Sequence, residues 1–390
     1  MSDWSTLKLG DLGETIIGLT YSPSQIRADG TLVLRSSNIQ NGLLDLKDTV
    51  RVNAPIPEKL RVGPSDVLIC VRNGSRPLIG KSLYLDERVA GETFGAFMAL
   101  FRSPLNYYRR FFFESNAFKR QVEEHLGATI NQITNKSLKG FEVTYPNDAD
   151  ERARISEYLV DANDLIASLG QLIAKKRAIK QGMMQELLSG RTRLPGFTGE
   201  WTTTRLSRVL RFQPGFPFSS QYFTEKPVGP RLVRNRDLRA EDAIVYYTGP
   251  VPIDFVLARG DVLIGMDGDF EPMVWFQPGA LLNQRVGRLR LTSSIDGAFL
   301  SHALVGPLKV LQGETGATTV KHLSHSDVEQ LELLLPPVAE QRAIARALDD
   351  AGRLIVSLER RLETTRAIKQ GMMQELLTGR TRLPVEEAVA

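Results

Sequence analysis

The sequence has little cysteine, little histidine and no long apolar run, and each scarcity excludes a class of protein. Cys70 is the single cysteine, which excludes an internal disulfide framework and a cysteine-rich zinc site. The four histidines include only one His-x-x-His pair, at His322 and His325, and without a third ligand such a pair predicts no metal site. No apolar segment approaches the roughly 20 residues that span a bilayer, and the start lacks a basic-then-apolar leader, so we expect a cytoplasmic protein.

Length and composition indicate a folded protein of several domains. The chain has 390 residues, of which 42% are hydrophobic and 24% charged, which is ordinary for soluble globular proteins. One core of this length is improbable, so two or more domains are expected. The net charge of +4 permits an anionic partner without requiring one.

An internal repeat organises the chain. Residues 177–195 and 366–384 differ only at Ser189 and Thr378, and the preceding stretches 151–176 and 340–365 align in register. Weaker echoes follow in the same order with drifting offsets, as a duplicated domain with loop insertions predicts. They are Trp4 and Leu9 with Trp201 and Leu206, Arg35-x-x-Asn38 with Arg234-x-x-Asp237, and Asp66–Ile69 with Asp261–Ile264.

The repeated segments have the apolar period of long amphipathic helices. Each spans nearly forty residues, a rod of about 55–60 Å at the rise of an α-helix. In the first, one core position holds Ile155, Ala162 and Leu169, the other Tyr158, Leu165, Leu172 and Ile179, with Leu159, Ile166 and Ile173 widening the stripe. In the second, the stripe is Ile344, Leu348, Ala351, Leu354, Ile355, Leu358 and Leu362.

These observations predict an α/β (α+β) protein in which two mixed α/β heads are separated by two long antiparallel coiled-coil helices, with pseudo-twofold internal repetition. Gly182 and Gly371, inside the helices, indicate either close approach of another backbone or tolerated residues of a recent duplication. The predicted segments are a first head at 1–147, a central helix at 148–189, a linker and second head at 190–335, a C-terminal helix at 336–379 and a tail at 380–390.

Motifs for catalysis are scarce. Gly80-Lys81-Ser82 has the wrong glycine spacing for a phosphate-binding loop, and a turn explains it better. No methylase motif, nucleophile elbow or paired-carboxylate nuclease pattern is present. The aromatic run Tyr107–Phe113 is typical either of base stacking or of a buried helix, and we favour the core. We therefore predict a binding protein that is not itself an enzyme.

The chain resembles the specificity subunits of type I restriction-modification enzymes along its whole length. The resemblance is carried by the Trp-x4-Leu openings, by Gly260–Ile264 with Ser65 replacing the glycine in the first copy, and by the helix start Pro336–Ile344. It is carried most strongly by the twice-repeated Lys-Gln-Gly-Met-Met-Gln-Glu-Leu-Leu segment. The first copy departs at 147–152, which lack the second proline and the glutamine.

The resemblance implies that the heads are target recognition domains, each reading one half of a split, asymmetric double-stranded DNA sequence. It implies that the repeated helices bind two modification (methyltransferase) subunits, and that restriction (translocase/nuclease) subunits can join. No cofactor is expected on this chain, and S-adenosylmethionine is expected on the modification subunit. The rods would set the spacing of the half-sites.

Candidate DNA-contacting residues are polar and basic residues in loops after the echoed strands, because Arg suits guanine, and Asn and Gln suit adenine, in the major groove. In the first head they are Tyr21, Ser22, Ser24, Arg35, Ser36, Asn38, Arg72, Asn73 and Lys81; in the second they are Ser219, Ser220, Gln221, Tyr222, Arg234, Asn235, Arg236, Gln284 and Arg285.

The matching helix ends present candidates for binding a partner twice. They are Lys180, Met183, Met184 and Arg191 in the first copy and Lys369, Met372, Met373 and Arg380 in the second. Two alternatives stay open, a scaffold whose heads bind peptides and an enzyme that uses Lys81 as a nucleotide ligand. Neither explains why the helices match while the heads diverge.

Overall fold

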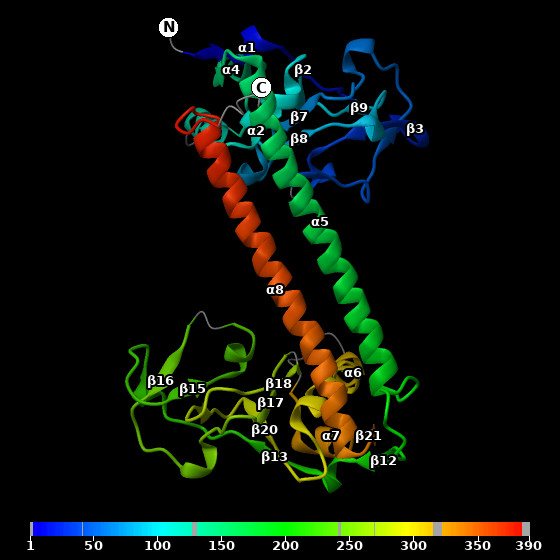
Figure 1. Ribbon diagram of the computed structural model, residues 1–390, viewed down its shortest axis with the longest axis vertical. Coiled ribbons are helices and arrows are strands. Elements are labelled where there is room, and N and C mark those ends of the chain that lie inside the picture. The colour runs from blue at the N-terminus through cyan, green and yellow to red at the C-terminus, as the bar shows by residue number, and fades with distance from the viewer. Residues whose placement is uncertain are drawn as a thin grey trace, which may run out of the picture. The chain divides into compact units, whose positions relative to one another are not determined.

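The computed structural model describes residues 3–40, 42–126, 131–240, 243–268, 270–314 and 322–383 (Figure 1). The chain forms two compact units. Unit 1 comprises Met1–Gly170 and Arg360–Ala390, and unit 2 comprises Gln171–Glu359. Each unit thus contains a head, the start of one long helix and the end of the other. The boundaries between the units therefore fall within the long helices and differ from the sequence segments predicted above. Among the described residues, no helix is long and apolar enough to cross a membrane.

The head of unit 1 is built on a four-stranded antiparallel sheet in the order β2-β10-β7-β8. A second sheet, in the order β6-β3-β9, contains a parallel pair between β3 and β9. The strands are β1 Trp4–Lys8, β2 Glu14–Ile17, β3 Ile26–Leu34, β4 Ile39–Gln40, β5 Leu43–Leu44, β6 Arg51–Val52, β7 Val67–Cys70, β8 Ser82–Tyr84, β9 Thr93–Phe94, β10 Met98–Arg102 and β11 Glu142–Pro146, and the helices are α1 Leu9–Leu12, α2 Asn106–Glu114, α3 Asn116–Leu126 and α4 Asn135–Gly140.

The head of unit 2 repeats this plan. Its main sheet has the order β13-β20-β17-β18, and its second sheet, β14-β16-β15-β19, again contains one parallel pair, β15 with β19. In both heads the first strand pairs antiparallel with the strand that leads into the long helix, β1 with β11 and β12 with β21. The elements are β12 Thr202–Arg205, β13 Leu210–Pro214, β14 Phe223–Thr224, β15 Arg231–Val233, β16 Val245–Tyr247, β17 Val262–Gly265, β18 Pro272–Val274, β19 Leu281–Leu282, β20 Val286–Leu291, β21 Glu332–Leu335, α6 Gly297–Glu314 and α7 His325–Glu329.

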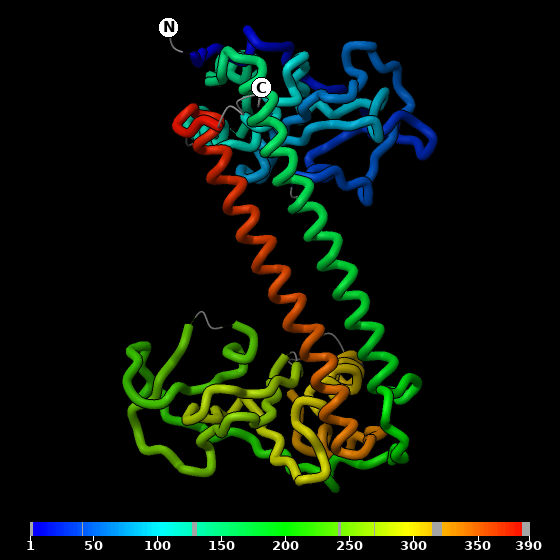
Figure 2. Tube along the Cα trace, in the orientation of Figure 1, coloured from blue at the N-terminus to red at the C-terminus, as the bar shows by residue number. Residues whose placement is uncertain are grey.

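The two long helices are α5, Ala149–Leu188, and α8, Val338–Leu376. Pro336 and Pro337 precede the first turn of α8, and a glycine follows the last turn of each helix. Gly190 and Gly379 have φ values of +71° and +70°, the left-handed conformation that closes a helix. Figure 2 traces α8 to its red C-terminal turn, which lies beside the head of unit 1.

The helices run antiparallel within each unit. In unit 1, Ile155 and Leu159 near the start of α5 share a buried cluster with Met373 near the end of α8. In unit 2, Leu187 at the end of α5 shares a cluster with Ile344 and Leu348 at the start of α8. The predicted fold class, mixed α/β heads with two long antiparallel helices and an internal repeat, is confirmed.

The buried seam of α5 differs from the predicted stripe in one respect. Ile155, Leu159, Leu169 and Ile173 are buried, at alternating spacings of four and three residues that also include Ala162 and Ile166. The second predicted core position was wrong: Tyr158, Leu165, Leu172 and Ile179 are 38–49% exposed, and so is Leu354 of α8, at 43%. Residues three and four positions along from a buried residue lie on the same face of a helix. In α5, Leu159, four residues after Ile155, is buried, whereas Tyr158, three residues after it, is exposed.

Tryptophans close both long helices. A Cβ added at Gly190 would lie 3.2 Å from the Trp201 ring, and one at Gly379 would lie 2.9 Å from the Trp4 ring. Each Trp therefore packs on a helix end where only glycine combines the left-handed backbone with this close approach. This contact gives the repeated Trp-x4-Leu openings a structural reason.

A buried carboxylate at the start of each long helix binds an arginine from beyond the end of the other. Glu340, fully buried, accepts hydrogen bonds from Arg193 at 2.9 and 2.5 Å and from the Trp201 indole at 3.2 Å. These bonds raise the pKa of the Arg193 guanidinium. The repeat-related pair is looser, with Arg382 Nε 3.9 Å from Glu151 Oε1.

Two other sequence interpretations are settled by packing. Phe111, Phe112 and Phe113 are at most 7% exposed, so the aromatic run of α2 forms core, as favoured. Gly182 and Gly371 do not mark close approach of another backbone, because a Cβ on either would meet no atom within 4 Å among the described residues.

The first prediction concerns Ser65, the one non-glycine residue with positive φ in the described part of the chain, at +72°; its counterpart Gly260 has φ +95°. The left-handed conformation costs a residue with a Cβ about 1–2 kcal/mol, and the added freedom of glycine in the unfolded chain offsets about half. We expect Ser65→Gly to stabilise the protein by about 0.5–1 kcal/mol and Gly260→Ser to destabilise it similarly, by denaturant unfolding. Opposite signs would contradict the assignment.

The second prediction concerns Glu340. Removing its charge leaves Arg193 without its buried counter-ion, whereas Glu151 holds a more distant arginine. We expect Glu340→Gln to lower the melting temperature clearly more than the matched variant Glu151→Gln, measured by calorimetry. Equal effects of the two variants would show that the short contact is not what stabilises unit 2.

Candidate nucleic-acid interface

In both heads a glycine lies between the first strand of the main sheet and the loop that carries candidate residues. A Cβ on Gly18 would lie 2.3 Å from the Gly95 carbonyl oxygen, and one on Gly215 would lie 2.0 Å from that of Asn283. The chain then continues into Leu19–Gln25 or Phe216–Tyr222, each ending in a short 3-10 helix. These loops therefore occupy equivalent places on the two heads.

The Arg-x-x-Asn and Arg-x-x-Asp echoes form the same turn. The Arg35 backbone N–H donates to Asn38 Oδ1 and that of Arg234 donates to Asp237 Oδ2, both at 2.9 Å. Asn38 is fully buried and Asp237 is 4% exposed. The amide of Asn38 also donates to the carbonyls of Asp45 and Asp48, so this candidate holds the loop from inside.

Several candidates of head 1 meet on one hollowed surface. Tyr21, Arg35 and Ser36 line a pocket together with Phe97, whose ring is 56% exposed. Ser36 Oγ accepts a hydrogen bond from Asn73 Nδ2 at 3.1 Å. We call this set of loops, 19–25, 35–38, 72–76 and 95–97, the head 1 surface.

The remaining contacts of the head 1 candidates lie on this surface, except those of Lys81, which lies outside the four loops. Ser22 and Ser24 are exposed, with their hydroxyls 2.7 Å apart. Arg72 lies over the Phe97 ring, 5.1 Å from its centroid, and Arg35 pairs with Asp48 at 2.9 Å. Lys81 Nζ donates to the Ile39 carbonyl at 3.4 Å and follows a glycine turn, an arrangement that forms no phosphate-binding loop.

Head 2 places its candidates in two groups. Ser219, Ser220, Gln221 and Tyr222 form one exposed segment, and the Tyr222 ring stands edge-on to Tyr247. The second group gathers around Asp267, a residue that the sequence reasoning missed.

Asp267 contacts three other residues of head 2. Its carbonyl accepts from Asn235 Nδ2 at 2.7 Å, and its carboxylate contacts Arg285 Nη1 at 3.3 Å and His322 Nδ1 at 3.0 Å. Gln284 and Arg236 lie nearby in sequence and are exposed. Arg234 is instead engaged by Asp237 and by the Ala243 carbonyl.

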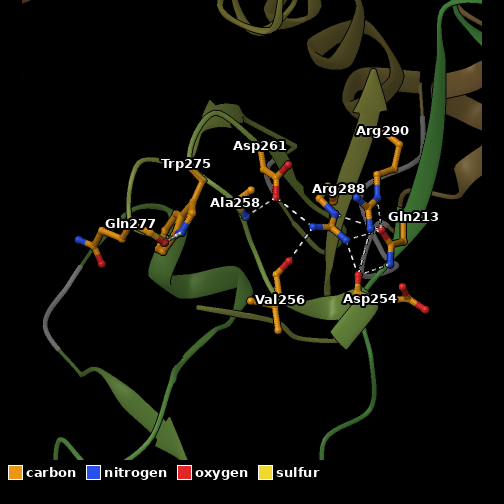
Figure 3. Close-up of polar contacts among 9 residues, drawn as sticks. All are labelled: Gln213, Asp254, Val256, Ala258, Asp261, Trp275, Gln277, Arg288 and Arg290. Atoms are coloured by element: carbon orange, nitrogen blue, oxygen red, sulfur yellow. Dashed lines mark hydrogen bonds and ion pairs between the residues drawn. The ribbon is translucent and has the colours of Figure 1, made fainter. Parts of the chain in front are cut away.

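A buried arginine, Arg288, links several segments of head 2 by hydrogen bonds (Figure 3). Arg288 of β20 is 1% exposed and donates to Gln213 Oε1 at 2.7 and 3.0 Å, to the Val256 carbonyl at 2.9 Å and to Asp261 Oδ2 at 3.0 Å. It also donates to the Asp254 carbonyl, which accepts from Arg290 as well. These bonds link strand β20, which begins one residue after Arg285, to the loop 254–261.

The matching position of head 1 is apolar. Strand registers pair Leu263 with Arg288 and Leu68 with Leu100, so Leu100 stands where head 2 has its buried arginine. Asp66 and Asp261 still share a role, since each accepts a backbone N–H at 2.8 Å, from Gly63 and Ala258. Asp66 binds Arg102 instead, and these hydrogen bonds raise the pKa of the Arg102 guanidinium. The same frame therefore holds different interiors.

The partner candidates are unevenly accessible although their sequences match. Met373 is 1% exposed and Lys369 is paired with Glu114 at 2.5 Å, while Met183, Met184 and Met372 pack partly buried against head cores. Lys180 lies over Gly352. Arg191 and Arg380 are exposed.

The helices also present exposed apolar side chains that the sequence reasoning assigned to the core or passed over. Ile179 is 45% exposed in unit 2, and its repeat counterpart Ile368 is 57% exposed in unit 1. Each precedes a glycine by three residues, Gly182 or Gly371, beside which there is open space. In the described ranges, no three His, Cys, Asp or Glu side chains gather as a metal site.

Comparison with known proteins identifies the family. A sequence model of the type I restriction modification DNA specificity domain matches residues 1–175 and 199–365. The Type I restriction enzyme EcoBI specificity subunit of Escherichia coli is 35% identical over 185 residues, 46% of this chain and 39% of that protein. The EcoKI specificity subunit of Escherichia coli (strain K12) is 22% identical over 423 residues, 96% of this chain and 87% of that protein.

Solved structures share the fold. The type I restriction-modification S subunit from M. genitalium superposes with a TM-score of 0.60 at 15% identity, covering 96% of each chain. A chain from work on complex assembly and conformational transition of the type I R-M system gives the same TM-score at 16% identity, covering 98% of this chain and 99% of that one. This protein belongs to the family of type I restriction-modification specificity subunits, and it carries two copies of the family's DNA specificity domain.

Proposed function

We propose that the protein reads a bipartite, asymmetric DNA sequence for a type I restriction-modification complex, one half-site with each head. The observation that carries this proposal is that two heads with the same strand order in their main sheets present different side chains at equivalent loop positions. A shared frame places both loop sets in the same way, while unlike side chains give each head its own base preference. The long helices tie the heads together, and their length would set the gap between half-sites.

The repeated helix ends would dock two modification subunits. Arg191 and Arg380 are exposed, and Ile179 with Gly182 is repeated as Ile368 with Gly371. Exposed apolar side chains beside open glycine positions favour a packed helix from another protein, and two equal sites favour two copies of it. Methyl transfer from S-adenosylmethionine would take place on that partner, so this chain would act without catalysing, and restriction subunits would join the same complex in the cytoplasm.

The third prediction tests DNA reading. The chain, co-purified with its modification subunit, is used to select from random DNA duplexes, and the bound pool is sequenced. We expect two unlike short blocks at one fixed spacing, with affinity that falls steeply with salt because phosphate contacts release counterions. A stable protein complex that enriches no sequence would exclude DNA reading and leave a protein scaffold.

The fourth prediction tests docking. Ile179→Glu and Ile368→Glu each place a charge at an exposed position, so the fold is retained while an apolar contact with the partner is lost. We expect each variant to reduce the bound modification subunits from two to one, by native mass spectrometry. Lys175→Glu, at another exposed position of α5, is the matched control and keeps both. Retention of two subunits by the isoleucine variants would place the docking surface elsewhere.

A further inference from the structure

Two positions in each head are structurally equivalent and chemically unlike. Arg72 and Asp267 both follow the central strand of the main sheet, by two residues after β7 and β17. Each forms an isolated antiparallel bridge, Arg72 with Gln132 and Asp267 with His322. The backbone N–H groups of Val71 and Met266, just before them, donate at 3.0 Å to the carbonyls of Phe97 and Arg285. Phe97 and Arg285 are therefore the second equivalent pair.

The arginine at these equivalent positions comes from a different segment in each head. Arg72 follows strand β7, whereas Arg285 precedes strand β20. In head 1, Arg72 lies over the exposed Phe97 ring, 5.1 Å from its centroid. In head 2, the position of Arg72 holds Asp267 and the position of Phe97 holds Arg285, and the two pair at 3.3 Å. Each head thus presents one supported arginine at the same place on its frame.

The support is too weak to be needed for stability. The Arg285 side chain is 55% exposed, and exposed ion pairs contribute little to the free energy of unfolding. Both contacts that Asp267 makes with Arg285 go to Nη1, which leaves the Nε and Nη2 donors outside the pair. A guanidinium held by one nitrogen keeps a planar donor edge for bidentate recognition.

In each head, the turn that carries the Arg-x-x-Asn or Arg-x-x-Asp echo is hydrogen-bonded to the segment after the central strand. In head 1, Asn73, the residue after Arg72, binds Ser36 of the Arg-x-x-Asn turn. In head 2, Asn235 of the matching turn donates to the Asp267 carbonyl at 2.7 Å. Three residues after Arg285, the buried Arg288 anchors strand β20 to Asp261 and Gln213. The loop beside the arginine is therefore held by one hydrogen bond in head 1 and by both the Asn235 contact and the Arg288 network in head 2.

We propose that Arg72 and Arg285 are the specificity-determining residues at matching places of the two heads, each reading a guanine in its own half-site, with Phe97 and Asp267 as the residues that position them. Guanine is the base whose O6 and N7 acceptors match a guanidinium edge in the major groove. The inference rests on the proposed DNA-reading function and specifies which residues deliver it.

The test compares base preference with affinity, using duplexes selected from a random library by the full chain with its modification subunit. Arg285→Lys keeps the charge and removes the fork. We expect overall affinity to change less than about threefold, while the preference for guanine at one position of one block falls roughly ten- to hundredfold and the other block is unchanged. Arg72→Lys is expected to do the same in the other block only.

Asp267→Asn tests positioning. It retains the backbone carbonyl that binds Asn235 and removes the charge that faces Arg285 and His322. We expect a smaller loss of the same guanine preference at nearly unchanged affinity. Arg259→Lys, an exposed arginine before β17 at the other end of that strand, is the matched control and leaves both blocks unchanged.

The outcomes separate this inference from the function on which it rests. If the wild-type complex enriches no sequence, both are overturned. If it enriches two blocks and both lysine variants select the same blocks, only the assignment of Arg72 and Arg285 is overturned. If the lysine variants weaken binding to every sequence alike, while their melting temperatures match the wild type, the arginines contact phosphates and the assignment is equally overturned.

Discussion

The packing of a helix start against a helix end is the interaction on which both units depend. Neither head is completed by its own stretch of sequence: Met373 and Leu376, from the far end of the chain, fill the cluster under Tyr108 and Ile155. A head of this size buries its helix-facing side chains only when the other copy supplies the second helix. Within the nearly identical segments 177–195 and 366–384, Leu187 and Leu376 are buried at matching positions against the two unlike heads.

The surfaces that receive the helix ends are built from helix, strand and cap residues, whereas the candidate reading surfaces are built from loops. Trp201, Glu340 and Gly190 illustrate the first group, since the Trp201 indole donates to Glu340 and its ring packs on Gly190. Arg72, Phe97, Asp267 and Arg285 illustrate the second, since exposed side chains on a fixed backbone bridge exchange without disturbing the core. The heads therefore differ at exposed loop positions whose backbone is held by neighbouring strands, as well as in their interiors, where Leu100 stands in place of Arg288.

The sequence predicted the architecture well because the repeat is strong and the apolar period is regular. It placed the seam of α5 incorrectly at Tyr158, Leu165, Leu172 and Ile179, since positions three and four residues apart share a helix face and only the partner helix decides between them. The sequence analysis named Arg285 as a candidate but missed Asp267. Nothing in the sequence distinguishes Asp267 from an ordinary loop carboxylate, because Asn235 and His322 contact it only in the folded protein. The burial of Arg288 could not be predicted for a similar reason, because an alternating strand sequence does not show whether an arginine is buried or exposed to solvent.

The tryptophans at the helix ends have an optical consequence. Trp4 packs on Gly379 in unit 1 and Trp201 on Gly190 in unit 2, while Trp275, 3% exposed, lies in the interior of head 2. The indole emission spectrum shifts to longer wavelength when the ring moves from protein into water. The chain thus carries a fluorophore at each junction between a head and a helix end, with a third as an internal reference. Replacing either junction tryptophan by phenylalanine would assign the signal, so that loosening of one unit during assembly would be observed separately from the other without any added label.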